Sequence, residues 1–357
     1  MRAYELGTPA RVIVFSPNWL GDAVLALPAL GDVRRRYPAA RLIVAARDTV
    51  ASLYGLTPAV DEVVPLEWTG QALAVRSRRH DLSRLRALQA DVAILLPNSF
   101  SSAWLAARAG VRERWGYAAD LRRPLLSRAV TRPAVRGHQS DYYRHLVREL
   151  GIENGPLEPG LDVPEALGES ARSLVRSHGW DGSRPLAVLA PGAAYGAAKR
   201  WPAAHFARLI SRLVSEYGAF CALVGGDADR QTTDAVRAQV DSAVRGSVAD
   251  LAGATTLQVL AGLFHVADVC VSNDSGAMHL AGAVGVPLAA LFGPTRERET
   301  APLTRTGGPA EVIINHVWCR PCMLRECPLD HRCMEQLAPD RVVASVVGLM
   351  GRRAGAR

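Results

Sequence analysis

The sequence predicts an α/β protein made of two Rossmann-like domains that face each other across a cleft, each with a parallel sheet. Apolar, strand-like runs alternate with amphipathic helical segments, which is the spacing of β-α-β units. The turn-rich segment Gly151–Pro164 interrupts this alternation, which then starts again. A length of 357 residues also suits two domains of about 150–200 residues better than one core.

Strands are expected wherever an apolar run is bounded by turn residues. These runs are Arg11–Ser16, Arg41–Ala46, Glu62–Leu66, Asp91–Leu96, Leu186–Ala190, Ala219–Val224, Ala267–Ser272 and Leu288–Phe292. Helices are expected over Gly21–Arg36, from Asn98–Ser102 onward, and over Ala203–Glu216, Asp229–Val240, Leu257–Phe264 and Gly276–Val284. The resulting domains cover residues 1–165 and 166–338, and residues 339–357 form a closing helix that has the first domain as one packing option.

The composition excludes several classes of protein. Hydrophobic residues make up 49% and charged residues 21%, so the chain is globular and neither disordered nor fibrous. No uncharged apolar stretch reaches the about 18 residues of a membrane-spanning helix. The first twenty residues lack the basic start and apolar core of a signal peptide, so we expect a cytoplasmic protein.

The basic residues are unusual in kind and in position. Lys199 is the only lysine among 42 basic residues, which indicates a position that a guanidinium does not suit, although chance is the plain alternative. Residues 76–148 hold 15 arginines against five acidic residues, while the whole chain carries +8. Such a surplus favours an anionic partner, unless it is only a solvated surface. Nucleic acid is disfavoured, because the segment contains no recognised nucleic-acid-binding motif.

The first candidate site is Trp19-Leu20-Gly21-Asp22, between the first expected strand and its helix. Gly21 permits a tight turn, and the helix dipole favours a charged Asp22 at neutral pH. A carboxylate there suits the role of assisting a hydroxyl while that hydroxyl attacks. The plain alternative is an acidic residue that only begins a helix.

The second candidate site is the loop of small residues from Pro191 to Pro202, which follows an expected strand. Gly192 and Ala193 allow a ligand to approach the backbone closely, and Lys199 stands near the end of the loop. This combination favours a cradle for a diphosphate, with Lys199 as a mobile charge on its oxygens. The loop lacks the Gly-Lys-Ser/Thr of a Walker motif.

The third candidate site is Asn273-Asp274-Ser275-Gly276, at the end of a strand and the start of a helix, with His279 one turn further along. Free amides at a helix start bind phosphate. The plain alternative is a helix cap followed by a packed core histidine. A triad hydrolase is excluded, because no G-x-S-x-G elbow occurs.

Four cysteines form the last cluster, spaced C-x2-C-x4-C-x5-C, namely Cys319, Cys322, Cys327 and Cys333. Four thiolates this close can hold a structural zinc ion or an iron–sulfur cluster. Two disulfides or four reduced thiols are the alternatives. No other segment has the spacing of metal ligands.

Read together and in this order, the motifs resemble those of the ADP-heptose:lipopolysaccharide heptosyltransferases of glycosyltransferase family 9, most of all the heptosyltransferase II branch. The segments that carry the resemblance are Trp19-Leu20-Gly21-Asp22, Leu96-Pro97-Asn98-Ser99-Phe100, Pro191-Gly192 through Lys199-Arg200-Trp201-Pro202, Asn273-Asp274-Ser275-Gly276 with His279, and Phe292-Gly293-Pro294-Thr295.

The resemblance implies a GT-B fold and an inverting transfer that requires no cofactor. It implies that Asp22 is the general base and that Lys199 neutralises the departing ADP. The implied acceptor-binding residues are Trp19, Asn98 and Ser99, and the donor-binding residues are Gly192, Ala193, Lys199, Asp229, Asp274, Ser275, Gly276 and His279. The ribose-binding acid is ambiguous, because both Asp227 and Asp229 follow the relevant strand. The cysteine cluster occurs in only some relatives.

The implied partners are ADP-heptose as donor and lipid A–Kdo–heptose as acceptor. We expect the arginines of residues 76–148 to contact the acceptor phosphates and the cytoplasmic face of the inner membrane, and the chain to act as a monomer. The alternatives are a GT-B relative with another donor or acceptor, including an epimerase, and a nucleotide-binding module without catalysis.

Overall fold

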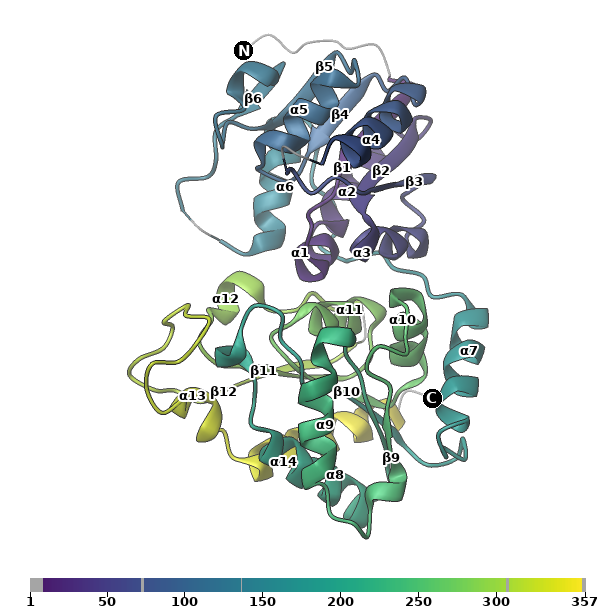
Figure 1. Ribbon diagram of the computed structural model, residues 1–357, viewed down its shortest axis with the longest axis vertical. Coiled ribbons are helices and arrows are strands. Elements are labelled where there is room, and N and C mark those ends of the chain that lie inside the picture. The colour runs from purple at the N-terminus through teal and green to yellow at the C-terminus, as the bar shows by residue number, and fades with distance from the viewer. Residues whose placement is uncertain (1–8, 72–73, 136, 306–307, 355–357) are drawn as a thin grey trace. The chain divides into compact units, whose positions relative to one another are not determined.

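The computed structural model describes residues 9–71, 74–135, 137–305 and 308–354. Figure 1 shows their helices and strands. Contacts divide the chain into two compact units, Met1–Leu161 and Asp162–Arg357. The division falls within the turn-rich segment Gly151–Pro164 and a few residues before the domain boundary predicted from the sequence.

The first unit is built on a six-stranded, all-parallel sheet. Its order is β3-β2-β1-β4-β5-β6, and the strands are β1 (Arg11–Phe15), β2 (Arg41–Arg47), β3 (Glu62–Leu66), β4 (Val92–Leu95), β5 (Glu113–Tyr117) and β6 (Arg128–Val130). Strand order reverses between β1 and β4. In such sheets ligands bind at this switch point, beyond the carboxyl ends of the strands.

Helices connect these strands, as expected for parallel pairs. They are α1 (Leu20–Leu25), α2 (Leu27–Arg36), α3 (Asp48–Ala51), α4 (Val75–Ala87), α5 (Phe100–Arg108) and α6 (Gln139–Glu149), with the 3-10 turns η1 (Ser52–Leu56) and η2 (Arg123–Leu125). The single helix predicted over Gly21–Arg36 is wrong, since the structure has two. Pro28, in the first turn of α2, lacks the backbone N–H that would donate to the Val24 carbonyl, so the helix is interrupted at Ala26.

The second unit repeats the same strand connectivity in a second all-parallel, six-stranded sheet. Its order is β12-β11-β10-β7-β8-β9, and the strands are β7 (Leu186–Ala190), β8 (Phe220–Leu223), β9 (Val248–Asp250), β10 (Val269–Asn273), β11 (Leu288–Phe292) and β12 (Ala310–Ile314). Here β7 and β10 flank the switch point. The predicted α/β class, with parallel sheets, is confirmed.

The helices of the second unit cover its sheet and link its strands. They are α7 (Glu165–Arg176), α8 (Ala203–Tyr217), α9 (Arg230–Gln239), α10 (Leu257–Val266), α11 (Gly276–Val284), α12 (Glu297–Thr300), α13 (Arg332–Glu335) and α14 (Pro339–Ala354), with η3 (Ala197–Lys199), η4 (Asp227–Asp229) and η5 (Arg245–Ser247). Among the described residues, no helix combines the length and the apolar character that crossing a bilayer requires.

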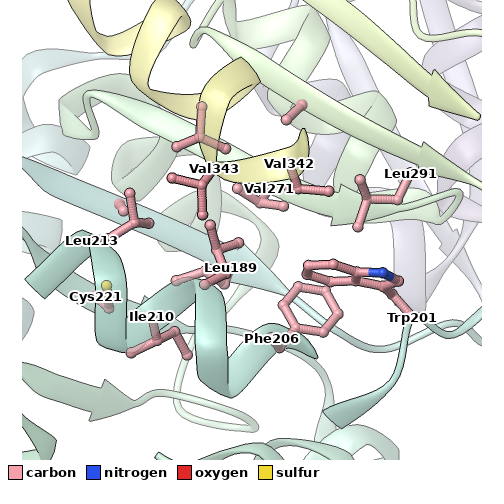
Figure 2. Packing of buried hydrophobic residues seen from close by; sticks show 14 of the residues in the cluster. Leu189, Trp201, Phe206, Ile210, Leu213, Cys221, Val271, Leu291, Val342 and Val343 are labelled. Carbon is pink, nitrogen blue, oxygen red and sulfur yellow. The ribbon is translucent and has the colours of Figure 1, made fainter. Parts of the chain in front are cut away.

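The closing helix α14 packs in the core of the second unit. Figure 2 shows Val342 and Val343 beside Leu189 and Leu213, all of them buried. Burying a side chain of this size contributes roughly 1.5–3 kcal/mol. The apolar face of α14 is therefore buried in the core of the second unit.

Candidate functional site

Asp22 lies in the first turn of α1, directly after β1. The Tyr143 hydroxyl of α6 donates a hydrogen bond to Asp22 Oδ1 at 3.0 Å. Burial, reinforced by the negative charge of Asp22, raises the pKa of Tyr143 well above its usual 10, so the phenol stays protonated. Burial and Asp22 likewise raise the pKa of Tyr54, whose hydroxyl lies 2.5 Å from Ser16 Oγ. One neutral tyrosine, Tyr143, therefore donates to this carboxylate, and a second, Tyr54, lies within range of its charge.

The predicted acceptor segment follows β4, the neighbour of β1 in the sheet. Asn98 Nδ2 donates to the Tyr142 hydroxyl at 2.8 Å, and Tyr142 precedes Tyr143 on α6. Ser99 is the N-cap of α5, with its side chain accepting from the backbone N–H of Ser102. Trp19, the N-cap residue of α1, is 64% exposed. The switch point of the first sheet thus brings together the predicted carboxylate and the predicted acceptor residues.

Arg122 is a residue of this site that the sequence prediction missed. Its side chain is fully buried, and its guanidinium donates to the carbonyls of Pro97, Ser99 and Tyr117 and to Ser102 Oγ. Burial lowers the pKa of Arg122 to about 10, so it remains charged at neutral pH. Through these hydrogen bonds, Arg122 fixes the backbone at Pro97 and Ser99. The sequence did not indicate this role, because Arg122 is only one of 15 arginines in residues 76–148.

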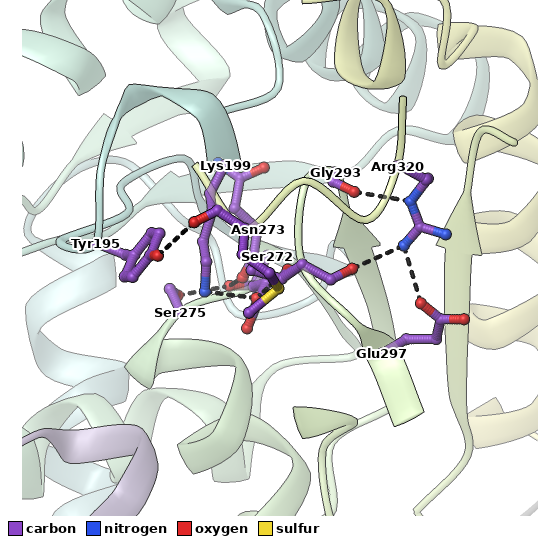
Figure 3. A network of polar contacts seen from close by, with 11 residues as sticks. Tyr195, Lys199, Ser272, Asn273, Ser275, Gly293, Glu297 and Arg320 are labelled. Carbon is purple, nitrogen blue, oxygen red and sulfur yellow. Dashed lines mark hydrogen bonds and ion pairs between the residues drawn. The ribbon is translucent and has the colours of Figure 1, made fainter. Parts of the chain in front are cut away.

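The second sheet places Lys199 beside Asp274. Lys199 Nζ lies 2.5 Å from Asp274 Oδ2, and the two side chains are 12% and 3% exposed. Thr295 Oγ1 donates to the same carboxylate oxygen at 2.6 Å. The ammonium also lies 4.8 Å from the centre of the Tyr195 ring, within the range of a cation–π contact. Figure 3 shows Lys199 and Tyr195 near the polar residues at the end of β10.

The loop of small residues is tied to β10 at both of its ends. Asn273 Nδ2 donates to the Pro191 carbonyl at 2.8 Å, and Asn273 Oδ1 accepts from the Trp201 backbone N–H at 3.1 Å. Ser275, the N-cap residue of α11, has its hydroxyl 3.2 Å from Ser272 Oγ. Gly276 opens α11, and the side chain of His279, one turn further, is buried.

The two aspartates that follow β8 differ in their contacts. Asp229 packs against the loop, since a Cβ added to Gly192 would lie 2.2 Å from Asp229 Oδ1. Asp229 Oδ2 also accepts from the Gly226 backbone N–H at 3.0 Å. Asp227 is 85% exposed and pairs with Arg230. Asp229 is therefore the aspartate that lies with Gly192 and the buried Ala193 at the end of β7.

The family is decided by comparison with known proteins. Residues 78–332 match the model of glycosyltransferase family 9, the heptosyltransferases. The chain belongs to this family. It is 30% identical to lipopolysaccharide heptosyltransferase 2 of Salmonella typhimurium, over 95% of this chain and 98% of the relative. The corresponding protein of Escherichia coli is 29% identical over the same shares.

The solved structures agree with this assignment. The structure of E. coli ADP-heptose LPS heptosyltransferase II matches with a TM-score of 0.82 and 28% identity, over 96% of this chain and 99% of that one. The GT-B fold class implied by the sequence motifs is thereby confirmed, as is the resemblance to the family. The chain is a heptosyltransferase, and hence an enzyme.

The cysteine cluster of this heptosyltransferase consists of free thiols. Cys333 is buried, which raises its pKa to about 11, whereas Cys322 is exposed. Within residues 9–71, 74–135, 137–305 and 308–354, no group of three His, Cys, Asp or Glu side chains is arranged to hold a metal ion. Among the described residues, the four cysteines therefore form neither a disulfide nor a group of metal ligands.

The segment that carries these cysteines braces the loops around Lys199. The Arg325 carbonyl accepts from the Ala198 backbone N–H at 2.9 Å, so closely that a Cβ on Gly196 would lie 2.3 Å from the same oxygen. The Tyr195 hydroxyl donates to the Met323 carbonyl at 2.8 Å. The sequence suggested only a metal site, disulfides or reduced thiols for this segment, because backbone contacts leave no pattern of residue types.

Arg320 supports the loop that follows β11. Its guanidinium donates to the carbonyls of Gly293 and Thr295 and pairs with Glu297 at 2.9 Å, as Figure 3 shows. Thr295 is the residue whose hydroxyl contacts Asp274. The segment after β12 therefore fixes the position of the Lys199–Asp274 pair in the heptosyltransferase.

Proposed function

We propose that this heptosyltransferase moves L-glycero-D-manno-heptose from ADP-heptose to the lipid A–Kdo–heptose acceptor of the lipopolysaccharide inner core. Two relatives bear the name lipopolysaccharide heptosyltransferase 2, and the matching solved structure is named for ADP-heptose. The observation that carries the proposal is that each sheet has reactive side chains at its switch point. The first offers the carboxylate of Asp22, and the second offers the ammonium of Lys199.

In the proposed step, Asp22 accepts the proton of an acceptor hydroxyl while that oxygen attacks the anomeric carbon of the heptose. The bond from this carbon to the ADP oxygen breaks, and its electron pair leaves with ADP, so the anomeric configuration inverts. A general base in such a step contributes about 10²–10⁴-fold. Asp22 suits the role because it lies at a helix start, where the dipole stabilises its charged form.

The donor side supplies charge to the leaving group. Without nucleotide, Lys199 is held by Asp274; with ADP-heptose bound, we propose that its ammonium contacts the diphosphate as negative charge develops there. Gly192 and Ala193 offer backbone to the diphosphate, and Asp229 accepts from the ribose hydroxyls. The remaining donor contacts are assigned to Asp274, Ser275, Gly276 and His279.

The acceptor side is assigned to Trp19, Asn98 and Ser99. The exposed indole of Trp19 offers an apolar surface to a sugar ring. Contact with acceptor phosphates and an anionic membrane is assigned to exposed arginines of residues 76–148, such as Arg76 and Arg132. Arg122 is not among them, because it is buried.

The decisive experiment incubates the protein with ADP-heptose and defined truncated core acceptors and identifies the product by mass. The proposal expects one added heptose on the acceptor that ends in Kdo–heptose, with release of ADP. Asp22→Asn should lower kcat by at least about 10²-fold and leave ADP affinity within twofold. Transfer of another sugar, or Asp22→Asn with near wild-type kcat, would contradict the proposal.

A further inference from the structure

The hydrogen bond between Tyr143 and Asp22 joins residues 121 positions apart in the chain. Tyr143 lies on α6, which packs against α1 and α2. Its side chain is 4% exposed. The next residue, Arg144, reaches the fully buried Asp32 of α2, with Nε 3.5 Å from Oδ2. The position of the phenol is therefore fixed by the packing of its helix and not by a flexible loop.

In the hydrogen bond between Tyr143 and Asp22, the phenol is the donor and the carboxylate is the acceptor. Tyr143 from α6 contacts Asp22, and Tyr54 from η1 lies within range of its charge; burial and the charge of Asp22 raise the pKa of both phenols. Gln139, one turn earlier on α6, hydrogen-bonds to Tyr143. On α2, Asp32 is held in ion pairs with Arg35 and Arg144, and the exposed Asp48 of α3 lies in solvent. The Tyr143 hydroxyl is therefore a neutral donor throughout the physiological pH range.

We propose that Tyr143 is a positioning residue for the reaction, which holds the Asp22 carboxylate in its reactive orientation and in its ionised form. The inference rests on the proposed role of Asp22 as general base. A carboxylate that rotates freely spends little time aimed at an acceptor hydroxyl, and one fixed oxygen determines where the other lies. A hydrogen bond donated to a carboxylate also favours its charged form over its neutral form.

Two opposing effects act on the ionisation of Asp22. Asp22 is half-buried beside the Tyr143 phenol, and partial burial by itself favours the protonated acid. The Tyr143 hydroxyl and the start of α1 oppose that effect. Asp22 is then ionised before the acceptor arrives, and it accepts the proton only as the new glycosidic bond forms.

The test is Tyr143→Phe in the full-length enzyme, assayed with ADP-heptose and the truncated acceptor across pH. The acidic limb of the kcat profile should move upward by about one pH unit, because a hydrogen bond to a charged group has been removed. At neutral pH kcat should fall about tenfold or more, with KM for ADP-heptose unchanged. Tyr37→Phe, which removes another buried phenol from the same unit, is the control and should leave both unchanged.

A double variant separates positioning from folding. In the Asp22→Asn background, Tyr143→Phe should have no further effect on the residual rate, since no carboxylate remains to be positioned. Should Tyr143→Phe unfold, Gln139→Ala leaves the ring in place and should shift the acidic limb in the same direction by less. An unmoved acidic limb in whichever of these variants folds, even with lower kcat, would overturn the inference. An active Asp22→Asn variant would instead overturn the proposed function.

Discussion

Lys199 Nζ and Asp274 Oδ2 are 2.5 Å apart, and Thr295 donates to the same carboxylate oxygen. The pair lies where the loop after β7 meets the end of β10. The compact ammonium fits between Asp274 and the Tyr195 ring, where a planar guanidinium would need a wider space. This gives a physical reason for the one lysine in a chain whose other basic residues are arginine.

Lys199→Ala should lower kcat for heptose transfer by about 10²–10³-fold, because the charge developing on ADP loses its partner. Lys199→Arg should restore less than a tenth of the activity, since the larger head group cannot take the same position. Steady-state kinetics with ADP-heptose measures both. Full activity of the arginine variant would show that only the sign of the charge matters at this position.

The two aspartates after β8 give a matched pair of variants. Asp229→Asn should raise KM for ADP-heptose by about tenfold or more, because a charged acceptor for the ribose hydroxyls is lost beside Gly192. Asp227→Asn changes the same residue type in the same turn, yet it only removes an exposed pair with Arg230 and should leave KM within twofold. Equal effects of the two variants would contradict the assignment of Asp229.

Arg122→Met should destabilise the first unit by at least about 2 kcal/mol, because buried carbonyls such as that of Tyr117 would lose their donor. KM for the acceptor should rise as well, since the segment at Asn98 is no longer held. Arg123→Met is the control at an exposed neighbour and should change stability by less than about 0.5 kcal/mol. Urea unfolding measures the difference, and similar midpoints would argue against a bracing role for Arg122.

Glu297→Gln should make stability less dependent on pH. Burial alone would raise the pKa of Glu297, but hydrogen bonds and Arg320 outweigh it and hold the pKa below 4.5. A lowered carboxyl pKa stabilises the fold above about pH 4.5, and this contribution is lost as the pH falls through the folded-state value.

The Glu297→Gln variant should therefore melt about 2–4 °C lower at pH 7, if the pair contributes about 1 kcal/mol. The difference in Tm from the parent protein should shrink as the pH falls below 4.5. Thermal melts followed by circular dichroism across this range provide the measurement. A difference in Tm that is constant over pH would show that the variant acts through packing and not through charge.

Several strands were not predictable from the sequence. The edge strands β6 and β9 have three residues each, too short for an apolar run to stand out. Strand β5 begins with Glu113 and Arg114, so its pattern is polar at the end where it starts. These strands form because a neighbouring strand supplies hydrogen bonds, and this information is not local.

The positions of several candidate site residues could be predicted from the sequence, whereas the residues that contact them could not. Asp22, Asn98, Lys199 and Asp274 each follow an apolar strand, which is a local signal that a sequence shows. Their hydrogen-bonding partners gave no such signal. Thr295 was noticed only as part of a motif, and its hydrogen bond to Asp274 depends on β10 and β11 being neighbours in the sheet.

Hydrophobic period and turn chemistry act over short stretches of chain, so the fold class and the loops that carry the reactive side chains were predictable from residue order. Long-range packing sets the pairing of β1 with β4 and of β7 with β10, and hence which loops share a switch point. It also selected Tyr143 and Arg122 as supports. Contacts of this kind join residues far apart in the chain, and they form only when whole helices and strands pack together.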